Sequence, residues 1–287
     1  MQKIKSLVDA RKEFSTQIKC EEHLIRIRWP DGVVCPRCGT KHPTYLQSRH
    51  KWQCKTCRYQ FSVTSGTIFH KTHIDLPRWM LAVWLMCHSP KGISSKQLQR
   101  EIGVTYKTAW YITKRIRRAM RHNVFEDLLC GIIEVDDAVV RASGDGTPSG
   151  NVKFEGKNVL GVAERGGLLR MFTLEDLKAK SIKRVIAQNL GEVQEIYSDA
   201  ASRLFFLAEF GLHQSVAHAY DEYVLGDAHV NTIENAWSLF KRGLIGIYHH
   251  VSAKCLQEYL DEFAFRYSHR REKAKMMDLV LASCLAR

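Results

Sequence analysis

The sequence predicts an α/β protein in which a mixed sheet flanked by helices follows a basic, cysteine-containing N-terminal region. Three observations lead to this class. Apolar, β-rich runs are concentrated after residue 128, and they alternate with helical segments toward the C-terminus. Two CxxC pairs lie well upstream, followed by short segments with helical spacing. At 287 residues the chain is long enough for two or three domains.

Charge divides the chain in the same way. Residues 1–121 hold 24 Lys and Arg against 7 Asp and Glu, whereas residues 122–287 hold 19 against 23. The first region is therefore expected to bind a polyanion, and the plain alternative is a basic, solvated surface. The start of the chain mixes apolar and charged residues, and the run from Trp79 to Cys87 is too short to span a membrane. We expect a soluble, cytoplasmic protein.

Four cysteines form two pairs that predict a metal site. Cys35 and Cys38 make one CxxC unit, Cys54 and Cys57 make the other, and fifteen residues separate the pairs. Two such turns supply four thiolates to a tetrahedral Zn²⁺ and leave no open position, so the metal is expected to be structural. A redox site needs only one CxxC, and disulfides are disfavoured inside the cell. We expect a zinc ribbon, a structure that binds DNA, RNA or protein in different proteins.

The segments between residues 77 and 121 have the pattern of a helix-turn-helix. One helix is expected over 77–88, a second opens at Ser94, and Gly103 and Val104 make the turn before a third helix that Thr105 caps. Such a motif places its second helix in the major groove of double-stranded DNA, and a plain helical bundle with a basic face is the alternative. The DNA-binding candidates lie on the last helix: Tyr106, Lys107, Thr108, Lys114, Arg115, Arg117, Arg118 and Arg121.

The region after residue 128 has the pattern of a mixed sheet flanked by helices. Hairpin strands come first, and helices and strands then alternate, which describes an α/β layout of ribonuclease-H type. The expected strands are 131–140, 157–164, 168–174, 195–199 and 214–217, and the expected helices are 181–190, 202–210 and a long helix from Asn231.

Three acidic residues in this region stand where a metal site could form. Strand alternation places Glu134 and Asp136 on one face of the first strand, and Asp199 ends a later strand. Glu234 lies on the polar stripe of the long helix, two turns before Lys241. Each acid by itself is more often a turn former or a solvated residue. Together, after a DNA-binding region, they supply what two Mg²⁺ ions need for an in-line phosphoryl displacement.

The chain resembles the zinc-ribbon DDE transposases of bacterial insertion sequences, on an ISXO-type branch related to the IS-one group. The resemblance covers nearly the whole chain, and its most specific stretch runs from His229 to Tyr267. Asp137 stands where such proteins usually have Glu, and 143–150 is more polar and Gly-rich than the basic loop expected there. The matching motifs are Cys35-Pro-Arg-Cys38, Cys54-Lys-Thr-Cys57, Glu134-Val-Asp136, Tyr197-Ser-Asp199, His229–Arg242, Gly246–Ser252 and Tyr259–Tyr267.

The resemblance implies a transposase that binds the ends of an insertion sequence and catalyses metal-dependent DNA cleavage and strand transfer. Asp136, Asp199 and Glu234 would be the catalytic triad and would hold Mg²⁺ or Mn²⁺, with Lys241 as the accompanying basic residue. Asp137 is the alternative to Asp136 as the inner metal ligand. The implied partners are the terminal repeats and the target DNA, and pairing two ends requires a homodimer or a higher assembly. A DNA-binding regulator derived from a transposase and a two-metal nuclease without transfer are the alternatives.

These assignments divide the chain into four parts. An N-terminal helical segment is expected over residues 1–29, a zinc ribbon over 30–70 and a helix-turn-helix region over 74–122. The ribonuclease-H-like catalytic domain is expected over 128–287, with helices at its C-terminal end.

Overall fold

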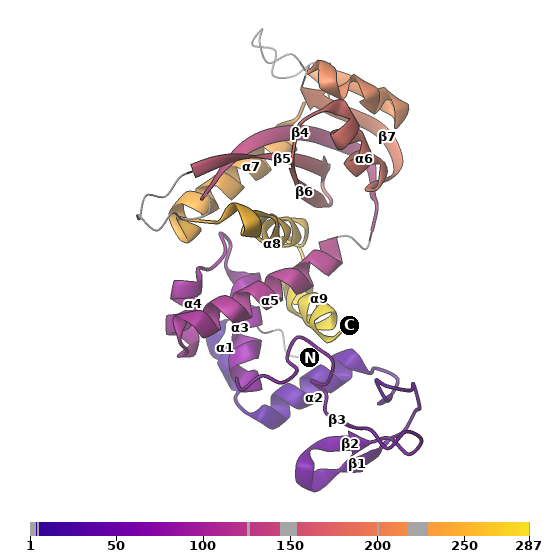
Figure 1. Cartoon of the computed structure of the whole chain (residues 1–287), viewed down its shortest axis with the longest axis vertical. Coiled ribbons are helices and arrows are strands. Elements are labelled where there is room, and N and C mark those ends of the chain that lie inside the picture. Colours follow the sequence, from indigo (N-terminus) through magenta and orange to yellow (C-terminus); the bar gives the residue numbers. More distant parts are fainter. Residues whose placement is uncertain are drawn as a thin grey trace. The chain divides into compact units, whose positions relative to one another are not determined.

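The computed structural model describes residues 4, 6–124, 127–143, 154–199, 201–216 and 229–286. Its internal contacts divide the chain into two units. Unit 1 consists of Met1–Ser89, Ser95–Ala119 and Glu272–Arg287, and it contains helices and a small sheet. Unit 2 consists of Pro90–Ser94 and Met120–Arg271, and it is built on a larger sheet (Figure 1). The C-terminal segment of the chain therefore belongs to the unit that contains the N-terminus.

Unit 1 begins with two short helices, α1 (Leu7–Glu13) and α2 (Gln17–Arg28), each started by a hydroxyl cap. The side chain of Ser6 accepts a hydrogen bond at the start of α1, and that of Thr16 does so at the start of α2. Both caps follow from sequence, because Ser and Thr satisfy N–H groups that a helix start leaves without partners.

Helices α3 (Leu76–His88) and α9 (Lys273–Leu285) complete the core of unit 1. Most of α3 is buried, as its long apolar sequence requires, and α9 packs against α2 and α3. His23 Nε2 of α2 lies 3.2 Å from Asp278 Oδ1 of α9. The sequence grouped the C-terminal helices with the large sheet, but α9 packs with the N-terminal helices because its apolar residues complete their core.

A three-stranded antiparallel sheet lies in the cysteine-containing segment. Its strands β1 (Thr44–Leu46), β2 (Lys51–Gln53) and β3 (Gln60–Phe61) pair in chain order, and η1 (Gln47–Arg49) joins the first two. Trp52 is 8% exposed, and the centres of the rings of Trp29 and Phe61 lie 5.5 and 6.0 Å from that of Trp52. These aromatic rings form the small apolar core that three short strands cannot provide by themselves.

Helices α4 (Ser95–Ile102) and α5 (Tyr106–Val124) follow one another closely. Gly103, between them, has a positive φ of 65°, which suits glycine and allows α4 to end. Thr105 Oγ1 accepts a hydrogen bond from the Thr108 amide at 3.2 Å, so the predicted cap of α5 is confirmed. The helix over 106–119 lies in unit 1, and its last turns lie in unit 2.

The larger sheet of unit 2 is mixed, as the sequence predicts. Its strand order is β6-β5-β4-β7-β8. The pairs β4–β5 and β5–β6 are antiparallel, whereas β4–β7 and β7–β8 are parallel. The strands are β4 (Leu129–Ser143), β5 (Phe154–Glu164), β6 (Leu169–Leu174), β7 (Leu190–Asp199) and β8 (Leu212–Val216).

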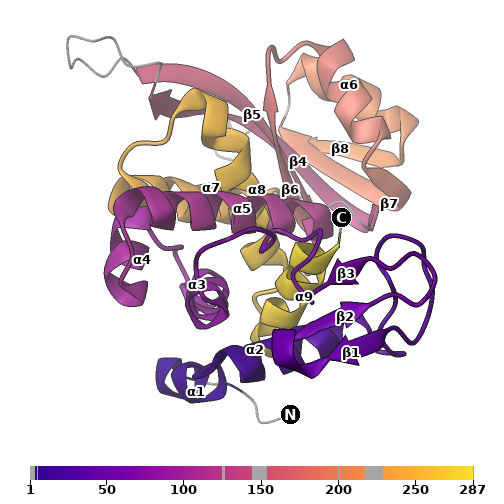
Figure 2. The ribbon, with the colours of Figure 1, turned by 60° about the horizontal axis from the view of Figure 1, so that its bottom comes forward.

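Helices cover both faces of this sheet. Ile133 and Val135 of β4 point to a buried cluster that contains residues of α6 (Ala179–Ala187) and of η2 (Ser202–Glu209). The opposite face is covered by α7 (Asn231–Gly243) and α8 (Leu256–Ser268), and Figure 2 shows α6 and α7 on opposite sides of the strands. A π-helical turn, η4 (Leu244–Tyr248), and the short η5 (Ala253–Cys255) connect α7 to α8.

Several boundaries differ from the sequence expectation. The predicted helix over 202–210 is a 3₁₀ helix, and β4 extends to Ser143. The remainder of the Gly-rich stretch over 143–150 lies outside the described residues. Among the helices that the structure describes, none is both long enough and apolar enough to cross a membrane.

Candidate functional site

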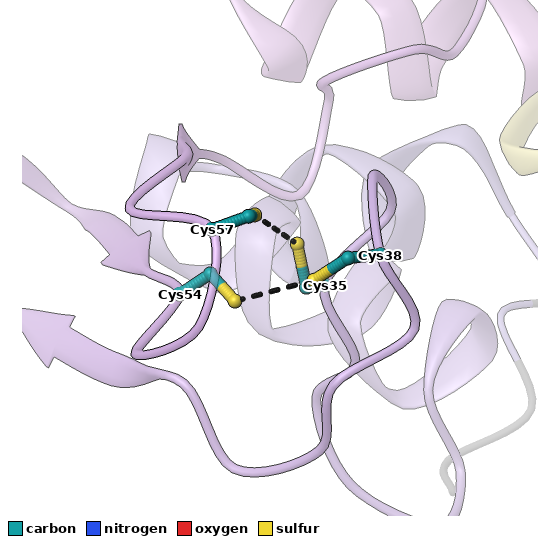
Figure 3. Close-up of side chains that lie close together, drawn as sticks. All are labelled: Cys35, Cys38, Cys54 and Cys57. Atoms are coloured by element: carbon teal, nitrogen blue, oxygen red, sulfur yellow. Dashed lines mark hydrogen bonds between the residues drawn. The ribbon is translucent and has the colours of Figure 1, made fainter.

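The four predicted metal-binding cysteines come together in unit 1 (Figure 3). Their sulfur atoms all lie within 4.8 Å of one another, and within the described ranges no other set of three or more His, Cys, Asp or Glu is as close. Cys35 Sγ lies 3.7 Å from Cys57 Sγ, and Cys38 Sγ lies 3.4 Å from Cys54 Sγ. Four thiols at this spacing fit a closed, tetrahedral zinc site of the structural kind.

The two CxxC turns have the same backbone construction. Gly39 donates to the Cys35 carbonyl at 2.9 Å, and Arg58 donates to the Cys54 carbonyl at 3.1 Å. Both donors have positive φ, 74° at Gly39 and 58° at Arg58, and each follows the second cysteine of its pair. Hydrogen bonds from the turn, with that of the Cys57 backbone the largest, lower the pKa of Cys54 to about 6, whereas burial and the neighbouring thiols raise the pKa of Cys57 to about 12. A lowered pKa favours the thiolate, which is the form that binds metal.

Removing one of these thiols is expected to cost the ribbon its metal and its fold. Cys57→Ser leaves three ligands, so we expect bound zinc to fall from about one equivalent per chain to near zero. Trp29 and Trp52 would then become solvated, with a red shift in tryptophan emission. Metal content and fluorescence measure both effects, and Cys130→Ser, at an exposed cysteine, is the control. A full equivalent of zinc in Cys57→Ser would contradict the assignment.

The DNA-binding candidates of α5 do not share one surface. Tyr106 and Lys107 are exposed at the start of the helix, and Arg118 is exposed farther along. Lys114 Nζ lies 4.9 Å from the centre of the Trp110 ring. These side chains leave cations and aromatic faces at the helix surface, which is a suitable composition for contact with nucleic acid.

Two other cations of α5, Arg117 and Arg115, are buried or bonded to other residues of the protein. Arg117 is 1% exposed, so the expectation that it contacts DNA is corrected: it lies on the buried side of the helix with Thr113 and Met120. Arg115 lies over the ring of Tyr111 and donates to the Ile68 carbonyl.

Two more candidates on this helix have polar neighbours of their own. Thr108 is half-buried, and its hydroxyl bonds that of Thr105 at 2.9 Å. Arg121 Nε lies 3.8 Å from the buried carboxylate of Asp261 in unit 2.

Two of the three predicted catalytic acids lie on neighbouring parallel strands. Val135 of β4 pairs with Ser198 of β7, so Asp136 and Asp199 occupy the next position on each strand. In a parallel pair, residues at the same position point to the same face and lie about 5 Å apart. The sheet therefore brings these two carboxylates side by side on the face that α7 covers.

The third acid, Glu234, lies in the first turn of α7, with its side chain exposed. Burial, followed by the charges of Asp199, Asp137 and Glu234, raises the pKa of Asp136 to about 6. Asp199 and Glu234 are thus near enough to Asp136 for their charges to affect its pKa. Their oxygen atoms are more widely spaced than the cysteine sulfurs, because the three acids do not form a set whose members all lie within 4.8 Å.

The residues at this place fit a divalent cation. Asp199 Oδ1 is buried and has no hydrogen-bond partner among the described residues. A buried carboxylate oxygen without a donor is costly unless a cation or water satisfies it. Carboxylate oxygens are the ligands that Mg²⁺ prefers, and several such groups in one place are stabilised by a bound cation.

Asp137 has a different environment from Asp136. It points to the opposite face of β4, where Arg203 NH2 and Nε of η2 lie 2.6 and 3.2 Å from Asp137 Oδ1. This ion pair leaves Asp137 engaged with a protein cation. Asp136 is the acid that shares a face with Asp199 and α7.

Lys241 lies near the end of α7, beside a hollow of about 590 Å³. Val139 and Ile245, which are 58% and 75% exposed, form part of its wall, and the other lining residues are partly aliphatic and partly cationic or imidazole. The full lining is Val139, Val140, Arg141, Lys241, Leu244, Ile245, His249 and His250.

The raised pKa of Asp136 predicts a pH-dependent stability. Because the pKa in the folded state, about 6, exceeds its ordinary value of 3.8, stability from this group is lost as the pH rises from 3.8 through 6. Asp136→Asn should therefore raise the melting temperature at pH 7.5 by about 2–4 °C. The gain should shrink as the pH is lowered to 5. Thermal melts of the full chain without added divalent cation, followed by circular dichroism, measure the change in melting temperature. A gain that is equal at both pH values would contradict the prediction.

Sequence reasoning missed the buried Glu134 and its partners. Glu134 is 0% exposed, and it bonds Arg165 and the start of α7. A signal was present, because the residue at the cap position of α7 is Val230, whose side chain cannot cap a helix. The sequence does not identify Glu134 as the acceptor that replaces the missing cap, since it lies 98 residues from Thr232.

The comparison with protein families agrees with this arrangement. Residues 128–268 match the ISXO2-like transposase domain, and residues 15–60 match the transposase zinc-ribbon domain. A protein that joins a four-cysteine ribbon to this mixed-sheet domain is of the transposase class. The chain is similar to ISXO2-like transposases over residues 128–268 and to transposase zinc ribbons over residues 15–60.

A relative of this chain occurs in a mobile element. It is the protein in transposable element ISH50 of Halobacterium salinarum, 29% identical over 284 residues, which cover 92% of this chain and 95% of the relative. Two solved structures, a pre-cleavage Mos1 transpososome and the Mos1 strand transfer complex, are 10% identical over 71% of this chain. They are covered to 78% and 76%, with TM-scores of 0.29.

Proposed function

We propose that this transposase is a DDE enzyme that binds the ends of an insertion sequence and catalyses DNA cleavage and strand transfer. The proposal is supported by the matching positions of Asp136 and Asp199 on neighbouring parallel strands and by the effect of the Glu234 charge on the pKa of Asp136. The pKa of Asp136, raised mainly by burial and further by neighbouring carboxylates, is typical of a site that a cation completes. The strand order and the helices on both faces support a ribonuclease-H-like catalytic domain.

Asp136, Asp199 and Glu234 would hold Mg²⁺ or Mn²⁺, which when bound activates a hydroxyl group and stabilises the leaving oxygen. In cleavage, water attacks phosphorus, and the P–O3′ bond breaks to leave a 3′-hydroxyl. In transfer, that hydroxyl attacks a target phosphate, and one phosphodiester bond replaces another. Lys241 binds a strand phosphate beside the acids, and its charge orients the DNA.

For DNA recognition we propose that α4 and α5 act as a helix-turn-helix on the terminal repeats. The exposed start of α5, at Tyr106 and Lys107, would enter the major groove, and Arg118 would contact phosphate. Two DNA ends must be held together for transfer, so a homodimer or a higher assembly is proposed.

The test is a gel assay with a labelled terminal-repeat duplex, a target plasmid and Mg²⁺. A transposase joins the label to the plasmid. Cleaved ends without joined product would instead indicate a nuclease, and binding without either product would indicate a regulator. Either outcome, with folded and zinc-loaded protein, would overturn the proposed strand transfer.

A single cation at the start of α5 tests the DNA-binding assignment. Lys107→Ala should weaken binding to the terminal-repeat duplex about 5–10-fold at low salt and reduce the salt slope by about one, because one phosphate contact is lost. Fluorescence anisotropy over a series of salt concentrations measures both. Lys180→Ala, at an exposed lysine of α6, is the control. An unchanged slope in Lys107→Ala would contradict a phosphate contact.

A further inference from the structure

Helix α7 starts without a capping side chain of its own. Its first residues are Asn231, Thr232 and Ile233, and the preceding Val230 makes no side-chain cap. The first amide groups of a helix need acceptors from elsewhere, particularly where the helix start is buried. Val230 and Ile233 are 2% and 0% exposed, so water is not the main acceptor at this start.

Glu134 of β4 supplies the missing acceptors. Its Oε2 accepts from the amides of Thr232 and Ile233 at 2.8 and 3.0 Å. Its Oε1 accepts from the Thr232 hydroxyl at 2.9 Å and from Arg165 Nε at 2.8 Å. A negative charge is favourable at a helix N-terminus. Both carboxylate oxygens are engaged with donors, which leaves this acid out of the proposed metal ligands although it shares a face with Asp136.

Arg165 extends the contact of Glu134 with the start of α7 to further elements, and we call Glu134 and Arg165 together the clamp. A second nitrogen of its guanidinium donates to the His229 carbonyl at 2.8 Å, just before α7. The guanidinium carbon lies 4.4 Å from the centre of the Tyr197 ring on β7, and the Arg165 amide donates to the Ile132 carbonyl at 3.0 Å. Glu134 and Arg165 thus tie the start of α7 to β4 and β7.

The proposed metal-binding acids are neighbours along the chain of residues in this clamp or in contact with it. Glu134 is two residues before Asp136 on the same strand face, and Glu234 follows Ile233 directly on α7. Asp199 is two residues after Tyr197 on β7. Every acid of the proposed triad is therefore within two residues of the clamp or of a residue that it contacts, and a shift of the helix start would move Glu234 relative to the two aspartates.

We infer that Glu134 is a positioning residue that, with Arg165, sets the spacing of Glu234 from Asp136 and Asp199 for divalent-cation binding. The inference rests on the proposed function, since it assumes that these three acids bind the cation. A displacement of about 1 Å at such a site can cost about 100-fold in rate. The same displacement should weaken the cation affinity in the absence of DNA.

The main test is Glu134→Gln in the zinc-loaded full chain. The amide keeps the shape, loses the charge and presents N–H groups to donors. We expect Mn²⁺ affinity, from the electron paramagnetic resonance signal of free Mn²⁺, to fall at least tenfold. Duplex binding should stay within about threefold, since phosphate contacts dominate it. Glu262→Gln is the matched control, because Glu262 is also 0% exposed and paired to an arginine, with Arg266 Nε at 3.3 Å.

The outcomes separate the inference from the proposed function. Loss of Mn²⁺ affinity in Glu134→Gln but not in Glu262→Gln supports the inference. Equal loss in both variants overturns it, as does a folded Glu134→Gln whose Mn²⁺ affinity is within twofold of that of the parent.

If Glu134→Gln does not fold, Thr232→Val is the deciding variant, because it removes only the hydroxyl bond to Glu134. A roughly threefold or larger loss of Mn²⁺ affinity in Thr232→Val supports the inference, and a smaller loss overturns it. If Asp136→Asn and Glu234→Gln leave Mn²⁺ affinity unchanged, the proposed function itself fails.

Discussion

Glu234→Gln is expected to abolish strand transfer while leaving the binding of terminal-repeat DNA intact. The side chain is exposed in the first turn of α7, so the substitution removes a negative charge at little structural cost. Loss of a group that stabilises charge in the transition state costs on the order of 10³-fold in rate. Quantified joined product from a labelled duplex measures the loss, and anisotropy measures binding. Activity equal to that of the parent would remove Glu234 from the proposed triad.

Substitutions of other acidic residues serve as controls in this experiment. Glu192→Gln, at an exposed residue near the other end of β7 from Asp199, should transfer strands at the parent rate. The choice between the adjacent aspartates is tested in the same assay. Asp136→Asn should behave like Glu234→Gln. Asp137→Asn should mainly lower the melting temperature, because it breaks the 2.6 Å contact with Arg203.

The sequence predicts those parts of the molecule that depend on local pattern. The CxxC spacing predicts the cysteine cluster, and strand alternation predicts that Asp136 and Val135 face opposite ways. Helical periodicity predicts a buried stripe at Ile233, Trp237, Phe240 and Leu244; the first three are buried in α7, and Leu244, just after the helix, is half-buried. These signals are contained in the element itself, since period 2 and period 3.6 determine which face is apolar.

Helical periodicity also places Arg117 on the buried face of α5. Ala109, Thr113, Ile116 and Met120 are each 0% exposed, and Arg117 lies on their side of α5. The sequence names all five cations between Lys114 and Arg121 as DNA-binding candidates. Spacing divides the run instead, because residues three or four apart share a face. Arg118 is exposed and Arg117 is buried for this reason alone.

The remaining features depend on contacts between distant segments. Glu134 replaces a missing helix cap on α7, and no local pattern identifies an acceptor 98 residues away. Helix α9 packs on α2 and α3 because the apolar surfaces fit there, and hydrophobic burial is not directional. Sequence patterns identify which residues need burial or a hydrogen-bond partner, whereas the tertiary fold determines which partner each of them contacts.

Gly161→Ala is expected to displace α7 and reduce both stability and activity. Gly161 lies opposite Asp136 in the β4–β5 pair, beneath α7. A Cβ added there would lie 2.6 Å from Ile233 Cδ1 and 2.8 Å from Trp237 Cζ2, which is closer than van der Waals contact permits. Overpacking of this kind costs about 1–3 kcal/mol. Because α7 carries Glu234, we also expect strand transfer to fall about 10–100-fold.

A compensating change distinguishes displacement of α7 from general damage to the sheet. Ile233→Val deletes Cδ1, the atom nearest to the added methyl group, so Gly161→Ala/Ile233→Val should regain part of both the stability and the transfer rate. Gly246→Ala is the control for stability, because a Cβ there meets no atom within 4 Å. Thermal unfolding and the joined-product assay would follow the three variants. Additive losses in the double variant would show that contact between β5 and α7 does not set the position of Glu234.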